Sequence, residues 1–281
     1  MRLLPICLLL AAAGSLLAQT ADTHRAAIQK IGFYADQFAR MAPSFTATET
    51  LEQSRLDEKK IMKPHKKDEP WPPVIKRTIV SAYGYAVTGT GVQEVRQILS
   101  VDGKPVKASG SLLDALAAGV SAESDEKRHK LMLDIEKHGL RGMVIDFAQI
   151  ILLFSKGAVQ RYEFEFQKEE EVEGQLYLIY RFNQIDGQQA VTIFEGKAPV
   201  KKKLQGEIWL RRTDLIPLHL VLQTEHTDKK ETVQDVTTVT YGTMDAYIAP
   251  QEVKHQQFRN GTLHVEDLFK YSEQKLAQAP K

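Results

Sequence analysis

Apolar and polar residues alternate along the chain with two different periods, which divide it into helical and strand-forming regions. Between residues 22 and 40 the apolar residues recur every three or four positions, which places them on one face of a helix. The residues of this stripe are Ala27, Ile28, Ile31, Tyr34, Ala35 and Phe38. After Pro43 the period changes to two, and we predict a strand over residues 44–54. One side of that strand carries Phe45, Ala47, Glu49 and Leu51.

A period of two also dominates most of the remaining chain and predicts a long series of strands. We expect strands at residues 74–87, 92–101, 162–166, 176–182, 204–211, 215–225, 233–243, 248–258 and 262–271. Dipeptides that favour tight turns follow several of these strands: Asp102-Gly103, Asp186-Gly187 and Asn260-Gly261. Many strands joined by short turns favour one large, mainly antiparallel sheet.

Two regions interrupt this alternation. Residues 55–73 are polar and lysine-rich and end in a proline cluster, so we predict a mobile loop there. Its basic residues either contact anionic lipid or stay solvated; they are Lys59, Lys60, Lys63, Lys66 and Lys67. Residues 111–155 return to helical spacing, with one or two helices expected at 111–137 and another at 140–155. The predicted fold class is therefore α+β, with a single domain over residues 19–281 whose helices cover one face of the sheet.

The first 18 residues have the pattern of a secretory signal peptide. A basic residue, Arg2, precedes an apolar run from Leu3 to Leu17, and Ala18 is a small residue suited to a cleavage site. The run is shorter than the roughly 20 residues of a membrane span, although an uncleaved anchor is the alternative. We predict an exported protein of the periplasm, or the extracellular space, of a Gram-negative-type bacterium. No later apolar stretch reaches membrane-spanning length, so no transmembrane segment is expected after signal cleavage.

Composition excludes several classes of function. The single cysteine, Cys7, lies too early in the apolar run for a lipoprotein signal, and its removal leaves no thiolate nucleophile, disulfide or cysteine-based zinc site. The chain has 37 basic and 36 acidic residues, and such a neutral balance argues against nucleic-acid binding. Stability must then come from burial and hydrogen bonding.

No catalytic or cofactor-binding motif is present. The phosphate-binding and dinucleotide-binding glycine patterns, the His-Glu-x-x-His zinc motif and the Gly-x-Ser-x-Gly elbow are all missing from the sequence. His255 and His264 could face each other across the Asn260-Gly261 hairpin, but zinc needs a third ligand, so surface histidines are expected. Glu163 and Glu165 stand about 7 Å apart on one strand, a separation found in glycosidases, but a solvated face explains them better. We predict no enzyme, no metal and no cofactor.

Several segments of the C-terminal half resemble a known family. Residues 206–210 read Gly-Glu-Ile-Trp-Leu; a short turn and a returning strand at 217–224 follow, then Val-Thr-Tyr-Gly at 239–242 and Ile-Ala-Pro at 248–250. This order resembles periplasmic lipoprotein carriers of the LolA/LolB type and related outer-membrane lipoprotein-sorting proteins, over residues 204–271. Residues 94–104 are similar to a stretch of uncharacterised secreted proteins of acidobacterial type.

The resemblance implies a strongly curved sheet, a half-open β-barrel, with helices covering its concave face. It also implies a protein that holds acyl chains in an apolar cavity while they cross the periplasm. The chain is longer than the small carriers, with the 55–73 loop and a larger helical middle. No individual binding residue can be carried over from the family.

The aromatic face of the predicted sheet must be covered or bind an apolar ligand. If the helices cover it incompletely, a lipid-sized space remains, and the candidate cavity residues are Tyr162, Phe164, Phe166, Leu178, Tyr180, Phe182 and Trp209. We therefore predict a non-catalytic periplasmic carrier for acyl chains of lipid or lipoprotein. The alternative is a cell-envelope interaction protein with a filled core that acts through its surface, for example through residues 55–73.

Overall fold

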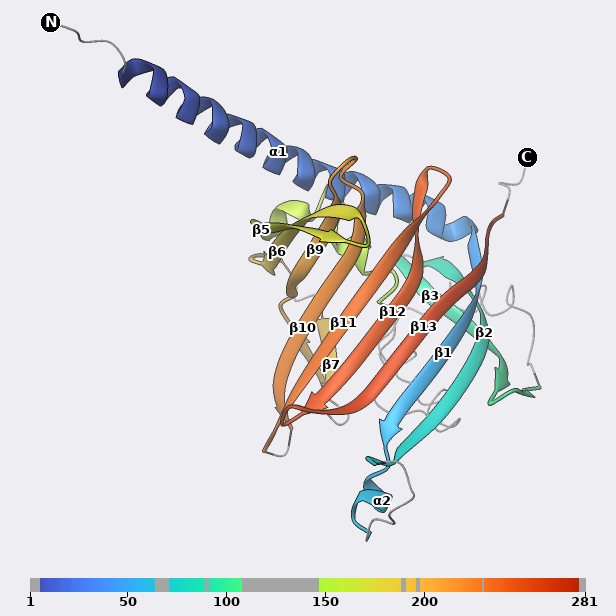
Figure 1. Ribbon diagram of the computed structural model, residues 1–281. Helices are drawn as coiled ribbons and strands as arrows, with labels where there is room; N and C mark the ends of the chain where they lie inside the picture. Colours follow the sequence, from blue (N-terminus) through green and yellow to red (C-terminus); the bar gives the residue numbers. More distant parts are fainter. Residues whose placement is uncertain are drawn as a thin grey trace, which may run out of the picture.

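One long helix and one large sheet make up most of the molecule (Figure 1). The computed structural model describes residues 6–63, 71–88, 91–107, 147–187, 191–195, 198–228 and 230–277. The α- and 3₁₀-helices are α1 (Ile6–Met41), η1 (Ala42–Ser44), α2 (Glu58–Ile61), η2 (Ile150–Phe154) and η3 (Val159–Arg161). The first strands are β1 (Phe45–Leu56), β2 (Val74–Thr88), β3 (Gly91–Val101), β4 (Lys104–Pro105), β5 (Tyr162–Val172) and β6 (Gln175–Gln184). They are followed by β7 (Val191–Glu195), β8 (Ala198–Lys202), β9 (Gln205–Arg211), β10 (Pro217–Asp228), β11 (Glu231–Met244), β12 (Tyr247–Arg259) and β13 (Thr262–Leu276).

The large sheet has 11 antiparallel strands in the order β4-β3-β2-β1-β13-β12-β11-β10-β9-β6-β5. Strand β13 pairs with β1, so the first and last of the described strands are neighbours in the middle of the sheet. The predicted single antiparallel sheet is confirmed. It is curved but does not close: β4 and β5 are its two edges, so it is not a closed barrel. Strands β7 and β8 form a separate pair.

The turn chemistry of the sequence explains the hairpins of the sheet. Asn260 and Gly261 have φ values of 47° and 78°, the left-handed pair that a two-residue hairpin between β12 and β13 requires. Asp102 and Gly103 have φ values of 49° and 73° and join β3 to β4 in the same way. Sequence analysis missed a third such pair, residues 173–174, which joins β5 to β6 with φ values of 54° and 77°. Most predicted strands are present and extend by a few residues beyond the predicted bounds.

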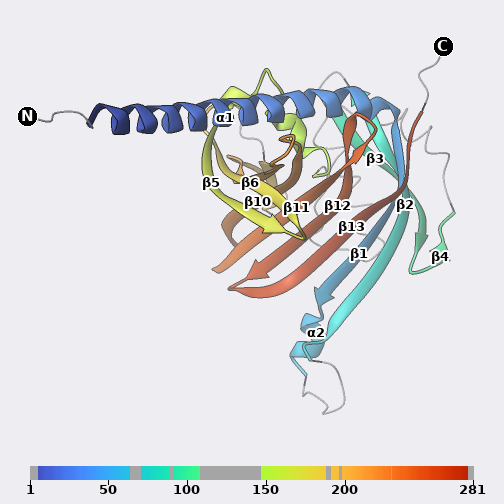
Figure 2. The ribbon, with the colours of Figure 1, turned by 45° about the horizontal axis from the view of Figure 1, so that its top comes forward.

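Helix α1 confirms the predicted helix at residues 22–40, and it begins earlier, at Ile6. Four residues of the predicted stripe, Ala27, Ile31, Ala35 and Phe38, are fully buried, because the helix lies with this face against the rest of the fold. Figures 1 and 2 show α1 crossing the ends of several strands of the sheet. Among the residues described with their side chains, which begin at Thr23, no helix is long and apolar enough to span a membrane.

The two regions that interrupt the alternation, residues 55–73 and 111–155, are only partly described. Of the helical insertion, residues 111–146 lie outside the described residues, and the part from residue 147 onward forms the 3₁₀-helix η2 where an α-helix was predicted. Covering of the concave face by helices therefore stays a prediction. In the 55–73 region, β1 continues to Leu56 and the short helix α2 follows, while residues 64–70 lie outside the described part. Asp57 caps α2 by accepting a hydrogen bond from the backbone N–H of Lys60 (3.3 Å).

Candidate functional site

The inner face of the sheet carries an aromatic wall near the β5 edge. We give this name to Tyr162, Phe164, Leu178, Tyr180 and Phe182, all predicted cavity residues and all at most 7% exposed. Phe154 of η2 packs on the wall, with ring-centroid distances of 4.8 Å to Tyr162 and 4.9 Å to Phe182. Burial raises the pKa of Tyr162 to about 12, as expected in apolar surroundings.

The other two candidates lie elsewhere. Phe166 faces the same way as the wall, with its ring 5.6 Å from that of Tyr180, but it sits on the edge strand and is 47% exposed. Trp209 lies on the opposite face, because its neighbours Ile208 and Leu210 both point into the core. There it contacts the rings of Tyr177 and His219, at centroid distances of 6.0 and 5.8 Å. The alternation around residue 209 could have revealed this placement.

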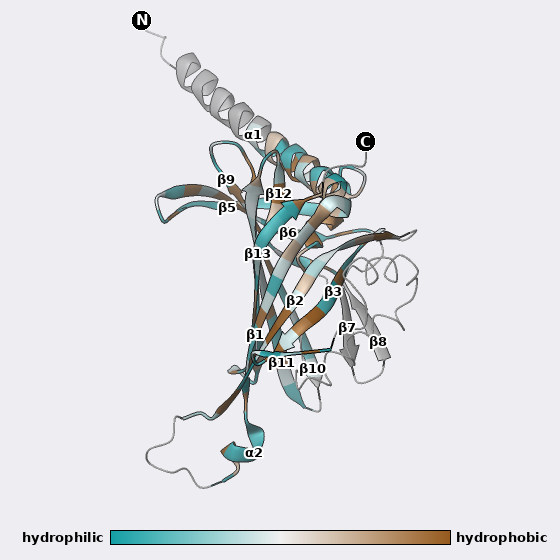
Figure 3. Cartoon of the chain, turned by 90° about the vertical axis from the view of Figure 1, so that its right-hand side faces the viewer, coloured by the Kyte–Doolittle hydropathy of each residue, from teal (hydrophilic) through white to brown (hydrophobic). Residues whose placement is uncertain are grey.

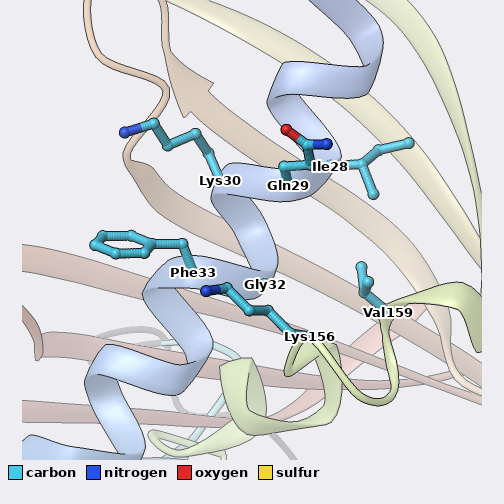
Figure 4. A pocket seen from close by; sticks show the side chains of 7 residues that line it. All are labelled: Ile28, Gln29, Lys30, Gly32, Phe33, Lys156 and Val159. Carbon is cyan, nitrogen blue, oxygen red and sulfur yellow. The ribbon is translucent and has the colours of Figure 1, made fainter.

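A groove opens between α1 and the segment that joins η2 to η3 (Figure 4). Its volume is about 480 Å³, and its lining is largely apolar. The lining residues are Ile28, Gln29, Lys30, Gly32, Phe33, Lys156 and Val159. Ile28 and Val159 also pack against the core cluster that contains the aromatic wall. Both sides of the groove therefore rest on the core to which the wall belongs.

Glycine at position 32 lets the two sides of the groove approach closely. A Cβ placed there would lie only 3.3 Å from the Cα of Lys156 and 3.2 Å from its Cγ. The backbone N–H of Lys156 donates a hydrogen bond to Oδ1 of Asp36 (3.3 Å), which ties the segment to α1. The ammonium groups of Lys30 and Lys156 lie 5.4 and 5.5 Å from the centre of the Phe33 ring. The groove thus combines apolar lining with positive charge.

A buried ion cluster that sequence reasoning missed lies farther along the inner face. Nε of Arg96 donates to both carboxylate oxygens of Glu49 (2.7 and 3.0 Å), and its Nη2 donates to Glu94 (2.6 Å). The side chains of all three are at most 6% exposed. Glu94 also accepts a hydrogen bond from the backbone N–H of Ala148 (2.9 Å), which fixes the start of the η2 segment to the sheet.

Burial and charge shift the pKa values in this cluster. Burial raises the pKa of Glu49, against the opposing effect of Arg96. Burial alone would lower the pKa of Arg96, but the two carboxylates outweigh it and raise that pKa well above its usual value. The signal for this cluster was present in the sequence: Glu49 falls on the apolar side of its strand.

A second buried cluster corrects the prediction of surface histidines. His255 is fully buried and contacts Asp267 through Nδ1 (3.1 Å) and Asp235 through Nε2 (3.0 Å). It pairs across the hairpin with Asp267, so the possible pairing with His264 is wrong. Gln53 donates to Asp267 (2.7 Å), so the cluster links β1, β13, β12 and β11.

The described residues offer no constellation suited to metal-based chemistry. No group of three or more histidine, cysteine, aspartate or glutamate side chains that could hold a metal ion occurs among them. Glu163 and Glu165 lie on the exposed side of β5, and Glu165 forms an ion pair with Arg181. Within each of the two buried clusters, the charged side chains pair with one another. None of these side chains lines the groove.

Comparison with known proteins gives distant structural matches. A LolA superfamily protein from Nitrosomonas europaea is 10% identical, with 90% of this chain and 94% of that chain covered and a TM-score of 0.38. An outer membrane lipoprotein-sorting protein domain from Vibrio parahaemolyticus is 13% identical, with 91% and 95% covered and a TM-score of 0.41. A DUF1329 family protein from Desulfovibrio piger is 10% identical, with 92% and 94% covered and a TM-score of 0.39.

No protein-family model and no curated protein matches the chain. At these identities and TM-scores the structural matches carry no functional weight, which leaves the functional argument to the residues of this chain. The names of two of these matched proteins, LolA superfamily and outer membrane lipoprotein-sorting, are those of the group that residues 204–271 resemble.

Proposed function

We propose that this protein is a non-catalytic, exported carrier that binds acyl chains of lipid or lipoprotein between α1 and the inner face of the sheet. The observation that carries the proposal is the groove between α1 and the η2–η3 segment, whose residues Ile28 and Val159 pack on the same core as the aromatic wall of an open sheet. The predicted signal peptide is the basis for proposing export to the periplasm.

The size and lining of the groove suit a hydrocarbon chain. About 480 Å³ falls within the roughly 300–1,000 Å³ of small-molecule sites. Ile28 and Val159 supply apolar surface, and each methylene buried there would contribute about 0.8 kcal/mol. An acidic head group at the mouth would find the ammonium groups of Lys30 and Lys156, whereas a cationic head group would be repelled.

The proposal requires α1 to move when the ligand enters. Its buried stripe consists of apolar side chains, two of them alanines, Ala27 and Ala35, and apolar contacts are not directional. A small displacement of α1 from the η2–η3 segment would connect the groove to the aromatic wall. The acyl chain would then continue from Ile28 toward Tyr180, whose ring lies 5.3 Å from that of His24 in α1.

We predict that Ile28→Asp weakens binding of a fluorescent fatty acid at least tenfold, because an unpaired carboxylate on the groove lining must be desolvated when the chain enters. Displacement of the probe by unlabelled fatty acid measures the affinity. Leu263→Asp is the matched control, since Leu263 is 38% exposed and belongs to a hairpin end outside the groove lining. Equal affinities of the two variants would place the binding site elsewhere.

The alternative, an envelope interaction protein with a filled core, has one observation in its favour. Met62 and Trp71 are 88% and 53% exposed near the end of the β1–β2 hairpin, a surface that a partner could cover. This alternative predicts no uptake of fatty acid by any variant, whereas the carrier predicts uptake by the native chain.

A further inference from the structure

The β1–β2 hairpin projects beyond the rest of the sheet. β2 pairs with β3 only from Ile79 onward, so residues 74–78 of β2 pair with β1 alone among the described strands. Asp102 of the β3–β4 turn contacts Arg77 and Thr78, and the residues from 57 to 63 follow the end of β1 at Leu56. We call residues 57–63 and 71–74 the tip. Figures 1 and 3 show α2, within the tip, at the end of the molecule farthest from α1.

The tip exposes large apolar side chains. Met62 is 88% exposed, the highest value for a large apolar residue in the described part of the chain, and Trp71 and Val74 are 53% and 47% exposed. The tip is well formed around them: the backbone N–H of Asp57 donates to the carbonyl oxygen of Pro73 (2.9 Å) and closes the hairpin. This hydrogen bond joins the two described segments of the tip at its base.

The tip and the strand ends beneath it are also positively charged. The described residues 55–63 and 71–77 include six basic and two acidic residues, whereas the whole chain has 37 and 36. One of the six, Arg77, forms an ion pair with Asp102 of the neighbouring β3–β4 turn. Lys59, Lys60 and Lys63 are all exposed. Of the two acids, Asp57 is engaged in capping α2. The excess of positive charge thus coincides with the exposed apolar residues.

We propose that the tip docks on a lipid bilayer that contains anionic lipids. Tryptophan and methionine enter the interface between head groups and acyl chains, and lysines near an anionic surface add attraction, so the two kinds of residue together give reversible anchoring. Charge complementarity selects an anionic surface over a zwitterionic one. The inference is independent of the acyl-binding groove, which lies next to α1.

Intrinsic fluorescence can report docking of the tip directly. The chain has two tryptophans, so Trp209→Phe leaves Trp71 as the only tryptophan, which can be excited selectively at wavelengths where tyrosine does not absorb. We expect the emission of Trp71 to shift to shorter wavelength, and to be quenched by brominated acyl chains, on vesicles of phosphatidylcholine with 30% phosphatidylglycerol. On phosphatidylcholine alone the change should be small. Added salt should reverse the binding, because it screens the lysines.

The triple variant Lys59→Gln/Lys60→Gln/Lys63→Gln should weaken binding to the anionic vesicles about a hundredfold at low salt. Its matched control is Lys230→Gln/Lys270→Gln/Lys275→Gln, which makes the same charge change at exposed lysines outside the tip. All variants share the same N-terminal residues, so any vesicle binding by those residues cancels. Met62→Ser should also weaken binding and reduce quenching.

Three results would overturn the proposal. Trp71 emission could stay unchanged on anionic vesicles, the tip and control triple variants could bind equally, or emission could respond to soluble polyglutamate and not to vesicles. The last result would assign the tip to an acidic polypeptide. Because fatty-acid binding is measured without vesicles, failure of docking and failure of the carrier function are distinguishable.

Discussion

Replacing Arg96 by methionine is expected to lower the free energy of unfolding by about 3–5 kcal/mol. The change leaves the carboxylates of Glu49 and Glu94 buried without their shared cation, and it also removes a guanidinium that lies 5.1 Å from the ring of Tyr83. The loss is a large fraction of the roughly 5–15 kcal/mol that stabilises a typical domain. Urea unfolding followed by far-UV circular dichroism measures it.

Two further variants separate the buried charge from the packing. Adding Glu49→Gln and Glu94→Gln to the Arg96→Met variant should recover much of the loss, because no uncompensated charge then stays buried. Arg181→Met breaks the exposed ion pair with Glu165 and should cost no more than about 1 kcal/mol. If Arg96→Met were as mild as Arg181→Met, the Glu49–Arg96–Glu94 cluster would not be buried as the structure shows.

Stability is also expected to fall as the pH rises from about 6.5 to 9. Burial lowers the pKa of His255, but its hydrogen bonds to Asp235 and Asp267 outweigh burial and raise that pKa to about 9. The native state then holds a proton that the unfolded state releases above its ordinary pKa of about 6.5. The bound proton adds about 3 kcal/mol to the free energy of unfolding. This stabilisation is fully present below pH 6.5 and is lost as the pH rises through about 9.

His255→Gln should abolish this pH dependence, because glutamine does not titrate. The variant should also be less stable than the native chain near neutral pH. His219 provides the control. Burial lowers its pKa, so His219→Gln should alter the pH profile only on the acid side of about 6.5. Unfolding curves at pH 6, 7.5 and 9 decide the matter; a slope that survives in His255→Gln would show that another group is responsible.

Alternation was enough to predict the sheet, because each strand shows one face to the core. Residues such as Ile208 and Leu210 are buried while the residue between them is not, and turn pairs such as Asn260-Gly261 separate one strand from the next. The helical stripe of α1 was predicted for the same reason. The extent of the strands was underestimated, since backbone pairing continues past the end of the alternating run, as in β13, which was predicted to end at residue 271 and ends at Leu276.

The buried charges could not be assembled from the sequence, because they meet only through long-range pairing. Glu49 and Arg96 are 47 residues apart and belong to β1 and β3, and Gln53 reaches Asp267 across 214 positions. Single residues did carry a signal: Glu49 and His255 share strand faces with Leu51 and Val253. The groove depends on how α1 meets the η2–η3 segment, which no local pattern specifies.

The claim that acyl chains enter beside α1 is tested most directly by native mass spectrometry of a variant in which a disulfide links α1 to the η2–η3 segment. In a protein with Cys7→Ser, the pair Gly32→Cys and Lys156→Cys brings two sulfurs within bonding reach, because a Cβ at position 32 lies 3.3 Å from the Cα of residue 156. We predict that the reduced form, which keeps Lys30 for the head group, takes up one fatty acid or phospholipid and that the form oxidised beforehand takes up none. Absence of any bound amphiphile in the reduced form, or equal uptake by both forms, would contradict the account.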